Sequence, residues 1–134
     1  MLFPTPIFSQ GSIMKIHIET HNKQQSIIAS LADNPTARDF YKLLPLKLKL
    51  SNYAGVEKIG NLDSRLSTKD APRSYAGRKG DLTYYAPWGN IAIFTDNSNV
   101  GEARGLIYFG RFEQGLEHLH QLPDDTEIII RPVQ

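Results

Sequence analysis

Residues 106–121 read LIYFGRFEQGLEHLHQ, and this stretch joins a strand pattern directly to a helix pattern. Its first part, 106–112, is rich in the aromatic and β-branched residues that favour strands. In its second part, Leu116 and Leu119 extend the apolar stripe begun by the strand at the spacing of an amphipathic helix. We therefore predict a strand over 106–112 that is followed at once by a short helix over 113–121.

Seven further strands are predicted around this stretch. The clearest is LKLKL at 46–50, where leucines alternate with lysines as in a strand with one face in water. Two β-prone runs flank Pro87 and Gly89, which form a turn of hairpin length. The seven predicted strands are Lys15–Glu19, Ser26–Leu31, Leu46–Leu50, Val56–Ile59, Asp81–Tyr85, Ile91–Thr95 and Thr126–Val133.

A second helix is predicted between the strands 26–31 and 46–50. Asn34 can accept hydrogen bonds from the free amides of a helix start, and Pro35 suits the first helical position. Apolar residues then recur at helical spacing until Pro45, which is expected to end the helix at Leu44.

Eight short strands and two helices favour a closed barrel. Closure removes sheet edges, and at this strand number side chains alone can fill the interior. The expected fold class is mainly β: a closed eight-stranded barrel whose open ends are covered by the two short helices. Residues 14–134 are expected to form this domain, and residues 1–13 an N-terminal arm, a cloning remnant or a misassigned start. The long polar stretch 61–80 is expected to be a loop.

Composition excludes several classes of function. The 134 residues fit one core, and 15 basic against 14 acidic residues lack the excess that nucleic-acid binding requires. No apolar run reaches the roughly 18 residues that span a bilayer, so no membrane partner is expected. The chain has no cysteine, which excludes thiol nucleophiles and thiolate zinc sites. We expect no cofactor, no metal and a cytoplasmic location.

Two sets of residues resemble a known family. Tyr108 to Leu119 resembles the cyclophilin run V-F-G-[KR]-V-x-x-G-[ML]-x-x-[VL], in which Gly110 would permit close backbone approach and Gly115 tight packing of the helix. A second set is Asn34, Pro35, Thr36, Ala37, Asp39, Phe40, Leu44, Pro45, Tyr53, Ala54, Gly55, Glu57, Lys58, Gly80, Asp81, Tyr84, Tyr85, Ala86, Pro87, Trp88, Gly89 and Asn90.

This second set resembles the bacterial and archaeal cyclophilin-like domain proteins, a group separate from the true cyclophilins. The resemblance extends over most of residues 14–133. It implies a cyclophilin-like barrel, a prokaryotic source and no settled activity.

The resemblance also bears on catalysis. Cyclophilins lower the barrier of an X–Pro bond, about 18–20 kcal/mol, with an Arg aimed at the prolyl nitrogen beside an aromatic pocket. The strand 46–50 carries no F-H-R motif, and the cyclophilin His and Trp positions fall on Leu106 and Gly101. The Q-F-F strand corresponds to residues 90–94, which lack the pocket Phe. Usual prolyl isomerase activity is therefore not expected, and no catalytic residue is assigned.

Aromatic residues around one hairpin turn mark a candidate ligand site. Strand alternation makes Tyr84 and Tyr85 face opposite sides, so one of them should enter the core. Trp88 in the turn offers a flat contact beside the amide of Asn90, but it could equally seal the barrel end. The candidate ligand-binding residues are Tyr53, Glu57, Tyr84, Tyr85, Trp88 and Asn90.

Other polar residues receive simpler interpretations. Glu57 could supply an acid or base at the same rim, but we expect an ordinary surface ion pair with Lys58. His118 and His120 are two positions apart on a predicted helix and point apart, so they are not joint metal ligands.

Two functions remain open from the sequence. The first is a noncatalytic module that binds a small molecule or short peptide at this rim. The alternative is an enzyme, either a weak prolyl isomerase or a hydrolase-like catalyst that uses Glu57. No oligomeric state is predicted.

Overall fold

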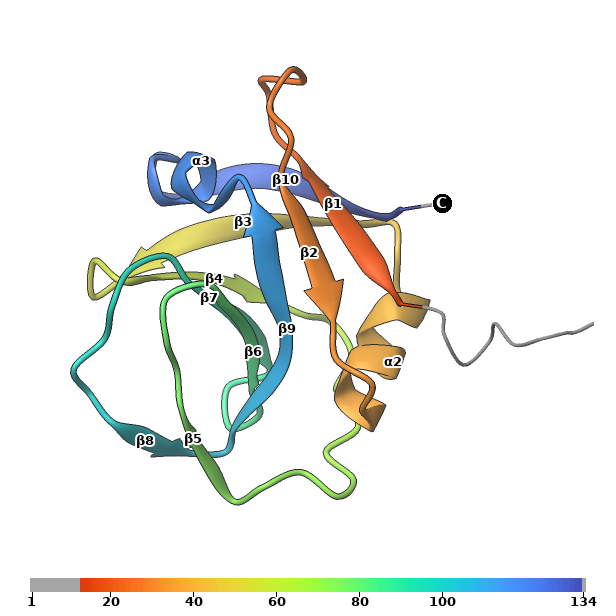
Figure 1. The fold of residues 1–134 in the computed structure, drawn as a ribbon, viewed down its shortest axis with the longest axis vertical. Coiled ribbons are helices and arrows are strands. Elements are labelled where there is room, and N and C mark those ends of the chain that lie inside the picture. The colour runs from red at the N-terminus through yellow and green to blue at the C-terminus, as the bar shows by residue number, and fades with distance from the viewer. Residues whose placement is uncertain (1–12, 134) are drawn as a thin grey trace, which may run out of the picture.

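The computed structural model describes residues 13–133, so the expectation for residues 1–13 lies almost wholly outside the described residues (Figure 1). In chain order the elements are β1 (Lys15–Glu19), β2 (Ile28–Leu31), α2 (Pro35–Lys42), β3 (Leu46–Tyr53), β4 (Glu57–Asn61), β5 (Ser74–Ala76), β6 (Asp81–Tyr85), β7 (Asn90–Phe94), β8 (Glu102–Arg104), β9 (Leu106–Gln114), α3 (Leu116–His120) and β10 (Thr126–Pro132).

Eight of these strands close into a barrel. The order around the barrel is β1-β10-β3-β4-β7-β6-β9-β2, and every neighbouring pair is antiparallel. These are the eight strands predicted from the sequence, so the closed mainly-β barrel is confirmed. Its interior is filled by alternate strand residues, among them the fully buried Ile16, Leu50, Leu82, Ile93 and Ile130.

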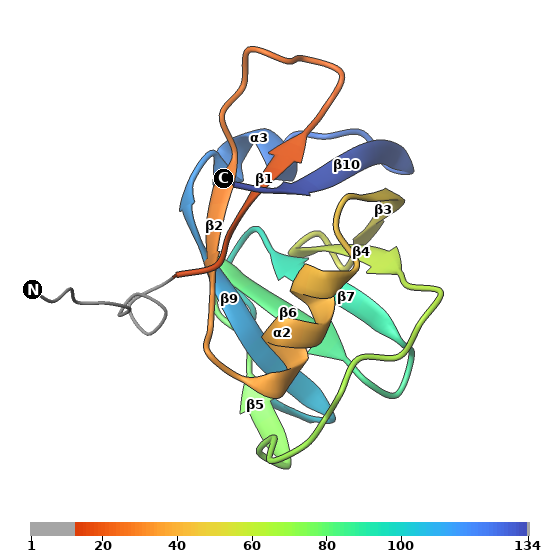
Figure 2. The ribbon, with the colours of Figure 1, turned by 90° about the vertical axis from the view of Figure 1, so that its right-hand side faces the viewer.

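Helix α2 forms as the sequence predicts. The Asn34 side chain accepts a hydrogen bond from the Ala37 amide at 2.8 Å, and Pro35 occupies the first turn. Phe40 is fully buried, and its ring lies 5.0 Å from that of Phe109 on β9. In both views α2 lies in the lower half of the molecule and α3 near the top (Figures 1 and 2). The helix ends at Lys42, two residues earlier than predicted.

Helix α3 is shorter than predicted and strand β9 is longer. Gln114 still pairs with Ile28 on β2, and Gly115 then turns the backbone with a φ of 86°. A Cβ on Gly115 would overlap the Ser26 carbonyl oxygen, and one on Gly110 would lie 2.9 Å from the Ser30 carbonyl oxygen. The close packing predicted at both glycines is thus confirmed, while the helix begins three residues later, at Leu116.

The predicted loop 61–80 contains a strand that the sequence did not reveal. β5 pairs with β8 in a separate two-stranded sheet, seen at the lower left of Figure 1. Each strand has only three residues, which is too short for a periodic pattern.

A buried carboxylate ties this small sheet to the barrel. Asp81 is 0% exposed and accepts hydrogen bonds from Tyr75 Oη at 2.7 Å, the Arg78 amide at 2.9 Å and Arg111 Nη1 at 2.7 Å. Because Tyr75 lies on β5 and Arg111 on β9, the side chain of Asp81 joins the two.

No helix in residues 13–133 is long and apolar enough to cross a membrane.

Candidate functional site

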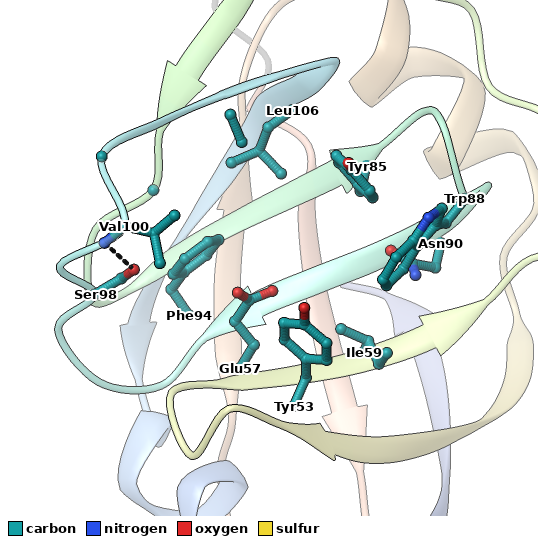
Figure 3. A pocket seen from close by; sticks show the side chains of 13 residues that line it. Tyr53, Glu57, Ile59, Tyr85, Trp88, Asn90, Phe94, Ser98, Val100 and Leu106 are labelled. Carbon is teal, nitrogen blue, oxygen red and sulfur yellow. Dashed lines mark hydrogen bonds between the residues drawn. The ribbon is translucent and has the colours of Figure 1, made fainter.

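A pocket lies between the outer face of the barrel and the β5–β8 sheet. Its volume is about 220 Å³ (Figure 3). The lining residues are Tyr53, Glu57, Ile59, Gly77, Tyr85, Trp88, Asn90, Phe94, Ser98, Val100, Gly101, Ala103 and Leu106. Five of the six candidate residues from the sequence therefore meet at one site.

Three aromatic rings form adjacent walls at one end of the pocket. The Trp88 ring lies 5.9 Å from that of Tyr53 and 5.2 Å from that of Tyr85, and it is nearly perpendicular to both, at 84° and 80°. Trp88 is nevertheless 57% exposed. The ring is thus held between two other rings and still open to solvent.

Tyr84 is not part of the pocket. Its side chain is fully buried in the barrel, and its hydroxyl accepts a hydrogen bond from the Leu66 amide at 3.2 Å. The prediction that one of the two tyrosines enters the core is confirmed, and Tyr84 is removed from the candidate ligand residues. Tyr85 faces the pocket because adjacent residues of a strand point to opposite sides.

Glu57 directs its carboxylate into the pocket (Figure 3). Among the described residues, no hydrogen-bond donor or cation lies within bonding distance of this carboxylate. Burial raises the pKa of Glu57 above its ordinary value of 4.5. The carboxylate therefore lies partly desolvated at the pocket with no protein partner in the described chain.

The expected surface ion pair between Glu57 and Lys58 is wrong. Lys58 points to the other side of β4 and is only 3% exposed. Its Nζ donates to the Leu122 carbonyl oxygen at 2.5 Å and to Asn52 Oδ1. Burial lowers the pKa of Lys58, and the nearby carboxylate of Asp124 opposes that shift. The alternation of side chains along a strand separates the two charges.

Asn90 brings a second unsatisfied acceptor to the pocket. The residue begins β7, is 2% exposed and lines the same pocket end as Trp88. Its Oδ1 is buried and has no hydrogen-bond partner among the described residues. A buried polar atom without a hydrogen-bond partner is uncommon in folded proteins.

Comparison with known proteins shows which family the chain belongs to. Residues 20–131 match the pattern described as the cyclophilin-like family. The chain belongs to the cyclophilin-like family. No functionally curated protein matches it significantly.

A solved structure has the same fold. The solution structure of a hypothetical protein from Archaeoglobus fulgidus superposes with a TM-score of 0.66 at 18% sequence identity. The match covers 93% of this chain and 98% of that one. At this identity the match shows that the two proteins share the cyclophilin-like barrel, and it carries no information on ligands.

The pocket of this cyclophilin-like protein includes positions that the sequence analysis compared with cyclophilins. Gly101 and Leu106, where the Trp and His of true cyclophilins were aligned, both line it. Phe94 also lines the pocket and supplies an aromatic ring that the alignment did not anticipate. Within the described chain, none of the lining residues is Arg or His.

The apolar wall of the pocket could not be predicted from the sequence. Phe94 and Leu106 form a small buried cluster with Ala92, and Ile59 and Ala103 pack against it. Ala103 belongs to β8, whose pairing with β5 had no sequence signal. The strand alternation of Phe94 with the core residue Ile93 was the one clue to an outward-facing apolar position.

Histidines do not form a metal site in the described chain. His120 Nδ1 lies 2.9 Å from Thr95 Oγ1, and His118 Nε2 lies 3.7 Å from a carboxylate oxygen of Glu117. Across residues 13–133, no three His, Cys, Asp or Glu side chains gather where they could hold a metal ion.

Proposed function

We propose that this cyclophilin-like protein is a noncatalytic binding module that holds a small molecule or a short peptide segment in the pocket beside Trp88. The observation that carries the proposal is the exposed Trp88 ring, fixed between Tyr53 and Tyr85 at the mouth of an apolar cavity. Large, rigid aromatic side chains with a few polar groups are typical of ligand sites.

The size of the pocket limits the ligand. A cavity of about 150 Å³ accommodates benzene, so about 220 Å³ leaves room for one ring with a short substituent. For a peptide, the same volume fits a single side chain, with the backbone lying across the rim.

A fragment screen followed by thermal unfolding tests the proposal. Fragments that raise the melting temperature of the wild-type protein are expected to lose that effect in Trp88→Ala, because the ring supplies the main contact area. Ile13→Ala is the control, since Ile13 is also an exposed apolar residue, at 65%, but lies outside the pocket. If every stabilising fragment acts equally on wild type and Trp88→Ala, this site is not the binding site.

Trp88 also offers a direct readout, because it is the only tryptophan in the chain. Its emission, excited selectively over tyrosine, should change as a ligand fills the pocket. An unchanged emission with ligands known to bind would exclude contact with Trp88.

A second candidate function, catalysis by Glu57, is favoured by the raised pKa of its carboxyl group. A carboxyl whose pKa moves toward neutrality is better suited to exchange protons at physiological pH. A panel of ester and amide substrates compared on wild type and Glu57→Gln tests it, and a rate that the substitution leaves unchanged counts against it. A protease-coupled assay on an X–Pro peptide tests the isomerase version, which a rate no faster than background excludes.

A further inference from the structure

The charge of the pocket lining favours a cationic ligand. Of its lining residues in the described chain, Glu57 alone carries a formal charge near neutral pH, and none is Lys or Arg. An anionic ligand would meet an uncompensated carboxylate, whereas a cation would give Glu57 the partner that no described residue supplies.

Two unsatisfied acceptors lie toward different ends of the pocket. Glu57 pairs with Phe94 in the β4–β7 register, and Asn90 precedes Phe94 by four residues on the same strand. At about 3.3 Å per residue, the backbone positions that carry the two acceptors are roughly 13 Å apart. Figure 3 shows Glu57 beside Phe94 and Tyr53, and Asn90 beside Trp88. One small cation therefore does not serve both groups.

The space between the two acceptors is apolar and aromatic. Tyr53 lies opposite Glu57 in the β3–β4 register, and its ring packs edge-on against Trp88. A cation at Glu57 is thus close to an aromatic ring, which adds a favourable cation–π contact. Tyr53 and Leu106 both line the pocket.

We propose that the ligand is an elongated organic amine: a protonated nitrogen binds the Glu57 carboxylate, a ring or short apolar body lies in the apolar space between the two acceptors, and an N–H or O–H group at the far end donates to Asn90 Oδ1. This inference rests on the proposed binding function and names the chemical class of its ligand. The oxygen of Asn90 is buried, so the donor reaches it only when a neighbouring side chain moves aside.

The two acceptors also favour this ligand class over related ones. A quaternary ammonium has no N–H to donate to Glu57, and an amine without a second donor leaves Asn90 Oδ1 unpaired. A ligand that carries the matching donor gains a hydrogen bond at this oxygen, and a ligand without that donor does not.

A set of matched probes tests the inference. Tyramine carries both donors on one ring, phenethylamine lacks the hydroxyl, 4-ethylphenol lacks the amine and 4-hydroxyphenylacetate replaces the amine with a carboxylate. Affinities are measured from amide shifts in two-dimensional NMR titrations. Tyramine is expected to bind about tenfold more tightly than 4-ethylphenol and several-fold more tightly than phenethylamine, and the carboxylate probe least tightly.

Two variants test whether the amine of the probe binds Glu57. Glu57→Gln is expected to remove the advantage of tyramine over 4-ethylphenol, because the charged acceptor is lost while the shape is kept. Glu127→Gln, an exposed glutamate on β10 outside the pocket, is expected to leave that advantage intact. An advantage that survives Glu57→Gln, or tighter binding of 4-hydroxyphenylacetate than of tyramine, overturns the inference.

One further outcome separates this inference from the proposed function, and another identifies the source of the amine. If no amine probe shifts the pocket amides but fragments of another chemistry do, the amine inference fails and the binding module stands. Competition between tyramine and Nα-acetyl-lysine amide, whose side-chain amine is free, supports an amine carried by a peptide side chain. Tyramine binding without such competition supports a free amine.

Discussion

Replacement of Asp81 with Ala is expected to destabilise the protein strongly and to open one wall of the pocket. The carboxylate is fully buried and accepts three hydrogen bonds, from Tyr75, Arg78 and Arg111. Hydrogen bonds to a charged group contribute about 1.5–3 kcal/mol each. Part of this sum is offset by the cost of burying the charge, and Arg111, whose side chain is 52% exposed, regains water in the variant.

The expected net loss is about 3–4 kcal/mol in the free energy of unfolding. For a domain of this size that corresponds to a fall of roughly 10–15 °C in the melting temperature. Tyr75→Phe removes only one of the three bonds and should cost about 1 kcal/mol. Urea unfolding followed by far-ultraviolet circular dichroism gives both values.

A second readout comes from Tyr75 itself. Burial, and then the hydrogen bond to Asp81 with the nearby carboxylate charge, raise the pKa of the Tyr75 hydroxyl. In Asp81→Ala this pKa should move back toward 10.0, the ordinary value of tyrosine, in an ultraviolet titration. The account of Asp81 as the anchor of β5 is refuted if Asp81→Ala costs no more than Tyr75→Phe.

Three further predictions concern single residues. Because burial raises the pKa of Glu57 above 4.5, the folded state holds the proton of this carboxyl group more tightly than the unfolded state does. The stability of the wild-type protein should therefore fall as pH rises through the window above 4.5. Glu57→Gln should remove this fall in thermal melts across pH, and parallel curves for the two proteins would contradict the prediction. Lys58→Met keeps the aliphatic chain but leaves the Leu122 carbonyl unpaired, so urea unfolding should show a loss of about 1–3 kcal/mol, and no loss would mean that this bond is unimportant. Gly77→Ala places a Cβ on the Phe94 ring, so the ring should be displaced into the pocket. Ligand affinity should then fall in an NMR titration. An unaltered affinity would show that the Phe94 ring is not displaced into the pocket.

The barrel could be predicted because its strands carry local patterns. Each of the eight strands alternates or is β-prone over four residues or more, and closure follows from the number of strands and the need to pair their edges. The β5–β8 sheet has no such pattern, because its two strands have three residues each and pair across about 30 positions, as Ser74 does with Arg104. Pairing between such distant short segments is decided by tertiary contacts, and the Asp81 hydrogen bond to Tyr75 holds one of the two strands, β5, against the barrel.

The candidate site could be predicted in part for the same reason. Alternation indicates that one of Tyr84 and Tyr85 is internal, but only the register of β6 against its neighbours decides which. The burial of Lys58 depends on partners at Asn52 and Leu122, and no local pattern reveals them. The unpaired oxygen of Asn90 is likewise a property of the folded chain.

The binding pocket is tested most directly by mapping fragment hits on the assigned two-dimensional NMR spectrum of the protein. We predict that the largest shifts cluster at the amides of β4, β7 and the turn that carries Trp88, and that they saturate with ligand concentration. Shifts scattered over the barrel, or gathered at the second depression, beside Lys79, Thr95 and His120, would contradict the account.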